Sequence, residues 1–590
     1  MRKLIGIILT MTIIMSLFVG CKKADNANDL TKELDETLDV EVSTQELFDS
    51  YLDRLARESL ERSPLTATFT LGDLEANGLF ELASQLDHID LDEAEENLNK
   101  AKEELKELES FDFDALTHDQ QLNYELTKFN LRHGIDQGAH MYIDNIIQPS
   151  SGIQVNVPLA LMQIEFESKE EIDAFVLRVQ ELPRLFDEAA AYEQERFEIG
   201  YGVPGFLYKE VVEQIEAMLV EPENYMMYLS FVDRIDEFEG LSEDEKESYK
   251  TDYLEIIRNE IYPAFEVLKK QAIIMSLSTN SGSVSEWTDG KEYYNALVKY
   301  KTADELDVEG LKAWANDELE SIVTSFQALT SKYPDLMSMN LNNAFPSYDS
   351  IDEVYEIVNE VYKTEFLDYG VTFASENIIP DYLEKHLAAG FYFPITIDGE
   401  DYGNMFLQAS DYDEITADTV ILYYHENIPG HHLYYSYISK SDQPMLRKMN
   451  EYLPYEEGWA SYVQNLAFGH LGLEDGVDEF FQLNSAYTNA FMVLMDIKFH
   501  YDGISIDELT NELLSLGYEA ESVDGIVNRM ISKPGEMIHY MFGEYKMNEL
   551  KKMYKEKMGK DYDVKLFHDF ILYHYGLPFY IVENEMDLLE

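Results

Sequence analysis

Cysteine is almost absent from this sequence, which contains one cysteine in 590 residues. A single cysteine excludes disulfide bonds within the chain, and it excludes a zinc site built from several thiolates. Any metal ion must therefore be held by histidine, aspartate and glutamate side chains. Only 13 histidines are present, so a local concentration of them is informative.

Positive charge is scarce as well. The chain has 44 Lys and Arg against 115 Asp and Glu, which gives a net charge of −71 at pH 7. A surface of this sign repels phosphate backbones, so we expect no nucleic-acid partner. The 16 prolines and 30 glycines are thinly spread and offer few linkers, which indicates one large body or two interlocked lobes.

The N-terminus has the pattern of an export signal. Arg2 and Lys3 precede an apolar run that extends to Val19. This order of a charged region followed by an apolar region is typical of secretory signal peptides. The alternative is an uncleaved membrane helix, but an apolar stretch of about 16 residues is shorter than the roughly 20 needed to span a bilayer.

The end of this segment resembles the lipobox of bacterial lipoproteins. Residues 17–21 read Leu-Phe-Val-Gly-Cys, with Phe18 where Leu is usual. The resemblance implies a signal peptide over residues 1–20 and a lipid on Cys21, so that the chain is anchored to the outer face of a bacterial membrane in the cell envelope. Residues 21–42 are acidic and nearly free of aromatic side chains, which predicts a solvated tether.

From residue 43 onward the apolar side chains recur with helical spacing. Most of residues 43–590 repeats this pattern, with Glu and Lys on the polar faces. The exceptions are residues 391–397 and 404–408, which are β-rich and have the turn signal Asp398-Gly399 between them. We therefore predict a mainly α-helical domain over residues 43–590, with a small β hairpin or sheet.

The densest histidine cluster lies at residues 425–432, which read His-Glu-Asn-Ile-Pro-Gly-His-His. Neutral imidazole is a preferred zinc ligand, so three histidines and a glutamate within eight residues indicate a metal site. The alternative is a polar helix end with exposed or hydrogen-bonded histidines. The zincin pattern H-E-x-x-H is not satisfied because position 429 is proline. Either His431 or His432 can therefore be the second ligand after His425.

A third ligand is expected because a catalytic zinc usually has three protein ligands and one open position. The candidate is Glu457 on the next helical segment, where Gly458 and Ala460 permit close helix approach; Glu456 is the fallback. Glu426 follows the first histidine, in the position of a general base that takes a proton from water.

These motifs resemble the domain-of-unknown-function 885 family of bacterial proteins. The resemblance rests on His-Glu-x-x-Pro-Gly-His-His followed by Glu-Gly-Trp-Ala at 457–460, and on weaker matches at residues 63–72, 200–204, 533–543, 567–569 and 576–578. That family is similar to helical gluzincin peptidases. The likeness implies a large multi-helix gluzincin-like fold, one Zn²⁺ per chain and a peptide substrate. Gln464 departs from the family pattern, where Glu is expected, so the group behind a ligand is neutral here.

Other candidate site residues follow from position. Tyr540, with His539 as the alternate, is the expected donor to the carbonyl oxygen, since it lies on a helix between two glycine-containing turns. Asp496 and His500 are four residues apart and are expected either to support or protonate the site or to form a surface pair. Arg529 is expected either to clamp a substrate carboxylate or to neutralise neighbouring acids. Asn404 and Phe406 lie on an edge-like strand that could align a substrate backbone.

The sequence therefore predicts a membrane-tethered extracytoplasmic zinc peptidase that hydrolyses short peptides or peptide-like amides. A solute-binding lipoprotein that uses the same cleft without turnover is the alternative, although it has no need of a general base beside the metal. Manganese, cobalt and iron also suit His and carboxylate ligands. The choice between exo- and endo-cleavage, the substrate sequence and the oligomeric state stay open.

Overall fold

The computed structural model describes residues 42–589, except 141, 150, 340–344, 380–389, 399–402, 409–414 and 519. The predicted signal peptide, Cys21 and nearly all of the predicted tether therefore lie outside the described residues. Within the described part the chain is mainly helical, as the sequence predicted, with one small sheet. None of the described helices is both long and apolar enough to cross a membrane.

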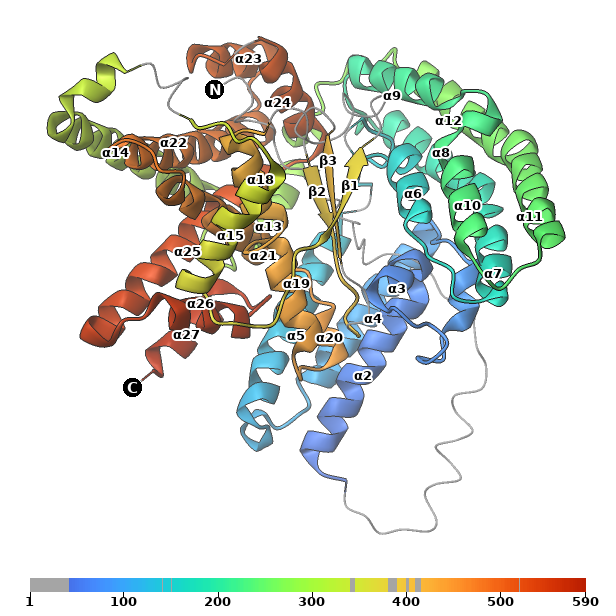
Figure 1. Ribbon diagram of the computed structural model, residues 1–590, viewed down its shortest axis with the longest axis horizontal. Helices are drawn as coiled ribbons and strands as arrows, with labels where there is room; N and C mark the ends of the chain where they lie inside the picture. Colours follow the sequence, from blue (N-terminus) through green and yellow to red (C-terminus); the bar gives the residue numbers. More distant parts are fainter. Residues whose placement is uncertain are drawn as a thin grey trace.

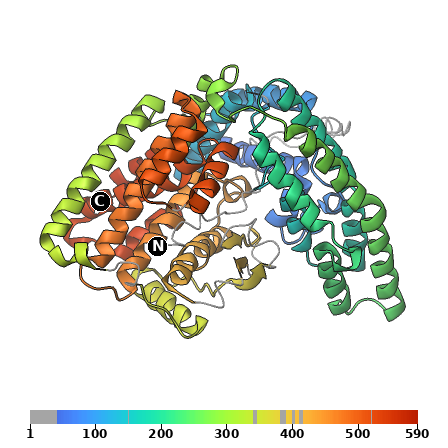
Figure 2. The same ribbon diagram turned by 90° about the horizontal axis from the view of Figure 1, so that it is seen from above.

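The first half of the chain forms two helical groups (Figures 1 and 2). The first group, drawn in blue, comprises α2 (Thr44–Arg62), α3 (Pro64–Thr70), α4 (Leu91–Leu108) and α5 (His118–Gly138). The second, drawn from teal to green, is an arm that comprises α6 (Ile153–Met162), α7 (Lys169–Val179), α8 (Leu182–Glu198), α9 (Gly205–Met218), α10 (Met226–Glu237), α11 (Glu243–Ile256) and α12 (Tyr262–Met275).

The second half forms the other arm and the centre of the molecule (Figure 1). Its helices are α13 (Gly290–Lys301), α14 (Val308–Lys332), α15 (Ile351–Glu365), α18 (Ala417–Glu426), α19 (His431–Lys440), α20 (Met445–Lys448), α21 (Leu453–Leu466), α22 (Val477–Ile497), α23 (Ile506–Ser515), α24 (Ala520–Ser532), α25 (Glu536–Met558), α26 (Val564–Tyr573) and α27 (Phe579–Asp587).

The sheet lies at the centre and has three strands in the order β1-β3-β2. Strands β2 (Gly390–Phe393) and β3 (Asn404–Gln408) are antiparallel, as the turn signal predicted, although β2 stops at Phe393 and residues 394–397 are not strand. The sequence missed β1 (Ser375–Ile379), which pairs with β3 in parallel. Strand β3 is therefore the central strand and not an edge.

Two large hydrophobic cores share helices, so the two arms are joined by more than loops. Helix α22 contributes Val493 to one core and Phe481 to the other, and α25 contributes Phe542 to one and Leu550 to the other. Because each of these helices packs into both cores, it ties the two arms together.

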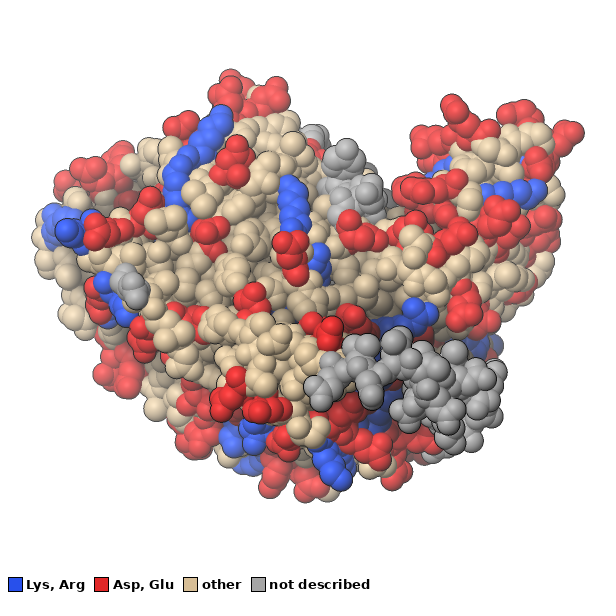
Figure 3. Space-filling view, turned by 90° about the horizontal axis from the view of Figure 1, so that it is seen from below, with Lys and Arg blue, Asp and Glu red and all other residues tan. Residues whose placement is uncertain are grey.

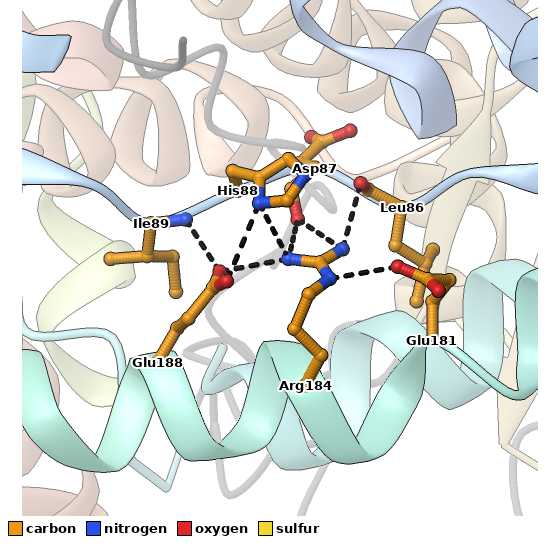
Figure 4. Close-up of polar contacts among 7 residues, drawn as sticks. All are labelled: Leu86, Asp87, His88, Ile89, Glu181, Arg184 and Glu188. Atoms are coloured by element: carbon orange, nitrogen blue, oxygen red, sulfur yellow. Dashed lines mark hydrogen bonds and ion pairs between the residues drawn. The ribbon is translucent and has the colours of Figure 1, made fainter. Parts of the chain in front are cut away.

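The N-terminal helices are attached to the arm that comprises α6 to α12 by a partly exposed network around one arginine (Figure 4). Arg184 of α8 donates hydrogen bonds to the carbonyl oxygens of Leu86 and Asp87, at 3.0 and 3.1 Å, and to Glu188 at 2.8 Å. Glu188 also accepts from the backbone N–H of Ile89. One guanidinium thus holds the segment that precedes α4.

Acidic side chains dominate the surface, as the composition predicted. Figure 3 shows Asp and Glu spread over the visible face, with few and scattered Lys and Arg. It also shows a notch between the arm that comprises α6 to α12 and the rest of the molecule. No continuous basic patch is visible on this face.

A buried glutamate connects three helices next to the centre of the molecule. Glu544 of α25 accepts hydrogen bonds from Asn465 of α21 at 2.6 Å and from Asn489 of α22 at 2.5 Å. Burial raises the pKa of Glu544 to about 7, although the bonds from the asparagines act in the opposite direction. The Oδ1 atom of Asn465 is buried and has no hydrogen-bond partner among the described residues.

This raised pKa predicts a pH-dependent stability. The folded chain holds the Glu544 proton up to about pH 7, whereas the unfolded chain loses it near pH 4.5, so the stability of the wild type falls as pH rises through this window. Glu544→Gln removes that loss, and its amide can donate to Asn465. The difference in unfolding free energy between variant and wild type should therefore grow in favour of the variant, by about 3 kcal/mol between pH 4.5 and 8.

Urea unfolding at several pH values measures this difference. Glu556→Gln, an exposed position on the same helix, is the matched control and should show a constant difference. A constant difference for Glu544→Gln as well would contradict the assignment.

Candidate metal centre

The histidine cluster forms a sharp turn between two buried helices. Helix α18 ends at Glu426 and α19 begins at His431, because Pro429 cannot continue a helix. Gly430 lies against the preceding helix so closely that a Cβ atom there would be 1.8 Å from the carbonyl oxygen of His425. Only glycine fits this position, and the tight turn brings His431 back to His425.

Three potential ligand atoms meet at this turn. The Nε2 atoms of His425 and His431 are 3.2 Å apart, and each is 3.5 Å from Oε2 of Glu457. Two ligands at about 2.05 Å from a tetrahedral zinc ion are about 3.3 Å apart, so this triangle has the size that zinc requires. All three side chains are at most 1% exposed. They are the only His, Cys, Asp or Glu group in the described part of the chain with this compactness.

Glu457 reaches the histidines because two helices cross in backbone contact. A Cβ atom on Gly458 of α21 would be 2.5 Å from the carbonyl carbon of Gly543 of α25, and a Cβ atom on Gly543 would be 2.1 Å from the carbonyl oxygen of Pro454. Small residues after Glu457 were expected to permit close approach to the histidine helix, but the helix that Gly458 approaches is α25. Trp459 adds a hydrogen bond from Nε1 to the Pro429 carbonyl oxygen, which attaches α21 to the histidine turn.

His432 is not part of the triangle, so its interpretation as a ligand is corrected. Its Nε2–H donates to the carbonyl oxygen of Thr372 at 2.8 Å, and its Nδ1 accepts from the hydroxyl of Tyr392 at 2.9 Å. Both ring nitrogens are thus used, and burial lowers the pKa of His432 to about 4. His432 positions strand β2 against α19, and His431 is the histidine that faces His425.

The groups behind the two histidines set their orientation. Nδ1–H of His425 donates to the amide oxygen of Gln464 at 2.8 Å, which leaves Nε2 with its lone pair toward the triangle. Glu456, the fallback ligand, lies instead on the other side of His431, with Oε1 3.6 Å from Nδ1. The sequence identified Gln464 as a neutral neighbour of a ligand but gave no signal for the position of Glu456.

The hydrogen bond from His425 to Gln464 predicts an effect on metal affinity. Gln464→Leu removes the acceptor that orients His425, and such losses typically weaken metal binding by about 10- to 100-fold. Competition with a chelating dye measures the dissociation constant for zinc. Gln482→Leu, an exposed glutamine on α22, is the control. An unchanged zinc affinity in Gln464→Leu would show that this bond does not orient a ligand.

Strong electrostatic coupling holds the triangle together. Burial alone lowers the pKa of His431, but the carboxylates of Glu457, Glu426 and Glu456 outweigh it and raise that pKa. Although burial acts to raise the pKa of Glu457, the two histidines hold that pKa well below its usual range. Three carboxylates thus surround His431, and this concentration of negative charge suits a cation.

Glu426 lies beside the triangle and takes no part in it. Both carboxylate oxygens are buried, and neither accepts a side-chain hydrogen bond from the described residues. Burial raises the pKa of Glu426 to about 8, although the neighbouring His431 acts to lower it. A buried carboxylate held next to a potential cation site is suited to accept and release a proton.

Asp496 and His500 have separate structural roles, so the interpretation of His500 as a catalytic residue is corrected. His500 donates from Nε2 to the Met530 carbonyl oxygen at 2.8 Å and accepts at Nδ1 from the Val284 N–H at 3.3 Å. Asp496 accepts from Tyr294 and from the Gly535 N–H. His500 lies in a π-helical turn, Lys498–Asp502, and its ring stacks on Tyr294 at 5.9 Å between ring centroids.

Arg529 neutralises a neighbouring acid, which was one of its two expected roles. It donates from Nε to Glu536 at 2.7 Å and from Nη2 to the hydroxyl of Tyr540 at 3.3 Å. Its guanidinium is thus engaged within the protein, and the alternative interpretation as a clamp for substrate is not favoured. His539, the next candidate, is buried, and its Nε2 has no hydrogen-bond partner among the described residues.

Asn404 and Phe406 do not offer an edge for substrate, so this expectation was wrong. Both lie on β3, which pairs with a strand on either side. Asn404 accepts from Asn377 at 3.2 Å, and Phe406 stacks on Phe391 at 4.7 Å between ring centroids. Their side chains hold the sheet together.

Comparison with known proteins agrees with the resemblance carried by the motifs. The model of a family described as "Bacterial protein of unknown function (DUF885)" matches residues 64–586. No match to a curated protein was found.

Two solved structures, each described as a "putative lipoprotein", share the fold. The one from Colwellia psychrerythraea has a TM-score of 0.80 at 17% sequence identity, and the match covers 92% of this chain and 99% of that chain. The one from Shewanella oneidensis, described as of unknown function, has a TM-score of 0.63 at 15% identity and covers 92% of this chain and 100% of its own. At these identities the likeness extends to the fold alone.

Proposed function

The chain belongs to the DUF885 family of bacterial proteins, and from that premise we propose that it is a zinc-dependent peptidase tethered to the outer face of a membrane. The observation that carries the proposal is the triangle of His425, His431 and Glu457 with Glu426 beside it. Its substrates are short peptides or peptide-like amides. The gluzincin-like character of the fold is part of this proposal.

The donor set fits zinc. Two imidazole nitrogens and one carboxylate oxygen are a common ligand set of catalytic zinc sites, and their mutual distances of 3.2 to 3.5 Å match tetrahedral geometry. Three protein ligands leave one position for water or substrate. Manganese, cobalt and iron(II) accept the same donors, so the proposal is for one divalent cation per chain, with zinc as the expected one.

When bound, Zn²⁺ supplies a Lewis acid for the scissile carbonyl and lowers the pKa of water. Glu426 accepts the proton of the attacking water and returns it to the leaving amine, for which its buried carboxylate is placed beside the triangle. His425 is held in orientation by its hydrogen bond to Gln464, and Glu456 lies 3.6 Å from Nδ1 of His431. No side chain forms a covalent bond to substrate in this scheme.

Tyr540 is proposed as the donor to the carbonyl oxygen of the substrate. Its hydroxyl oxygen accepts a hydrogen bond from Arg529 at 3.3 Å. It lies three residues before Gly543, the point at which α25 touches α21 next to Glu457. A phenol supported by a guanidinium is a good donor to a developing negative charge.

The anchoring of the protein is proposed from the lipobox. Lipidation of Cys21 would attach the helical domain to the membrane through the acidic segment that follows. The two solved structures of similar fold, each described as a "putative lipoprotein", support this location.

Binding without turnover is the second candidate function. Each of His425, Glu426, His431 and Glu457 is at most 1% exposed, so either a peptide or a bound solute enters only when the elements covering the site open. A solute-binding protein would need the same opening but would not need Glu426.

Digestion of a peptide library by the full chain tests the proposal. We expect cleavage that a chelator abolishes and that added zinc restores, and we expect His431→Ala to be inactive. His118→Ala, at an exposed position, is the matched control and should be active. Cleavage that is indifferent to the chelator, or no cleavage by a zinc-loaded preparation, would count against a metallopeptidase.

A further inference from the structure

A separate cavity of about 470 Å³ lies between the N-terminal helices and the centre of the molecule. Helices α2, α4 and α5 form one side, and α13, residues 446–453 and the start of α25 form the other. Its volume is within the roughly 300–1,000 Å³ of small-ligand sites. Its lining is largely apolar, and the three residues of the metal triangle are not part of it.

Two buried side chains line this cavity with polar atoms that the protein does not satisfy. Lys301 is 5% exposed, and its ammonium group forms no hydrogen bond or ion pair with any described residue. His539 is 8% exposed, and its Nε2 has no hydrogen-bond partner in the described part of the chain. Buried polar groups are normally paired, so the unpaired Nε2 of His539 indicates a missing partner, and the ammonium group of Lys301 lines the same cavity.

The acids near Lys301 are already engaged elsewhere. Glu536 binds Arg529 at 2.7 Å and Lys533 at 3.3 Å. Asp496 accepts from the hydroxyl of Tyr294 and from the Gly535 N–H. Burial lowers the pKa of Lys301 to about 7 even though Glu536 and Asp496 oppose this, so the pKa shift agrees that its charge is poorly compensated. Acidic and basic side chains both line the cavity, and Lys301 is the buried lysine that shares its lining with His539.

We propose that the cavity binds the C-terminal end of a peptide, with the terminal carboxylate between Lys301 and His539 and the last side chains against the apolar wall. An ammonium and an imidazole N–H are both donors that suit a carboxylate. The proposal deepens the proposed peptidase function and rests on it: it makes the protein an exopeptidase that acts from the carboxyl end.

The cavity is close enough to the metal triangle for this role. His539 lies one helical turn before Gly543, which is in backbone contact with Gly458, the neighbour of Glu457. The Cα atoms of His539 and Glu457 are therefore within about 14 Å of each other, the span of about four extended residues. Leu453, one turn before Glu457 on α21, is part of the cavity wall. The span therefore fits a peptide held at Lys301 whose bond to be cleaved lies a few residues from its end, once the elements that cover the triangle open.

Calorimetry with Leu-Leu-Leu and its C-terminal amide tests the proposal in the full-length Glu426→Gln chain, which should bind peptide without consuming it. The free acid should bind at least about tenfold more tightly than the amide. The negative field of the protein favours the more cationic amide, so non-specific attraction would give the opposite order.

Variants of the cavity side chains show which residues cause the preference for the free acid over the amide. Lys301→Met in the same background should remove the preference for the acid, and His539→Gln should reduce it. Lys299→Met, an exposed lysine on the same helix, should preserve it. Equal affinity of acid and amide in the parent chain would overturn the proposal without recourse to any variant, as would a preference that survives in a folded Lys301→Met chain.

The outcome is separable from that of the peptidase proposal. If the zinc-loaded wild type cleaves neither peptide but the acid preference depends on Lys301, the carboxylate site stands and hydrolysis does not. If the wild type cleaves acid and amide equally well, hydrolysis stands and the carboxylate site does not.

Discussion

Glu426→Gln is expected to lower kcat by about 10²- to 10⁴-fold while the chain retains its metal ion. Glutamine has the shape of glutamate but cannot accept the proton of water, and Glu426 is not one of the three residues that form the triangle. Steady-state kinetics on a peptide that the wild type cleaves measure kcat, and elemental analysis measures the metal content. Glu474→Gln, at an exposed glutamate, is the matched control and should behave as wild type.

The outcomes separate the two candidate functions. Lost turnover with unchanged peptide affinity supports a general base. A variant as active as the wild type would remove Glu426 from the mechanism. A wild type that binds peptide in the presence of zinc but never cleaves it, with Glu426→Gln binding equally well, would favour the solute-binding alternative.

Gly543→Ala is expected to destabilise the protein by about 3 kcal/mol or more, because the added Cβ atom would lie 2.1 Å from a backbone oxygen of α21. The clash is with backbone and not with a flexible side chain, so the two helices must separate. Since Glu457 is next to the contact point, zinc affinity should fall together with stability. Denaturant unfolding and zinc titration measure the two effects.

Gly525→Ala provides a control of the same chemistry. Gly525 lies in α24, where an added Cβ atom would meet nothing within 4 Å. Alanine there should stabilise the helix by about 0.5–1 kcal/mol and leave zinc binding unchanged. If the two variants behaved alike, the close crossing at Gly543 would not be what positions Glu457.

The sequence allowed a more complete prediction of the candidate metal centre than of the sheet. His425, Glu426 and Glu457 could be selected because their residue types and spacing are rare in combination. The choice between His431 and His432 could not be made, since Pro429-Gly430 allows either ring to turn back; the contact of Gly430 with the His425 carbonyl decides it. Strand β1 was missed because Ser375–Ile379 does not alternate between buried and exposed residues.

Roles inferred from spacing alone were less secure. Asp496 and His500 were paired because four residues make one α-helical turn, but each of the two side chains binds its own partners in the structure. Lys301 gave no signal, since a lysine near the end of a helix is ordinarily solvated. Its significance arises only from the packing of α13 against α25 and the N-terminal helices, which surrounds it with a cavity.

Anomalous diffraction at the zinc edge from crystals of the zinc-loaded chain tests the central claim most directly. The account predicts one peak per chain, about 2.0–2.2 Å from Nε2 of His425, Nε2 of His431 and a carboxylate oxygen of Glu457. A peak held by other residues, or no peak at these three side chains, would contradict it.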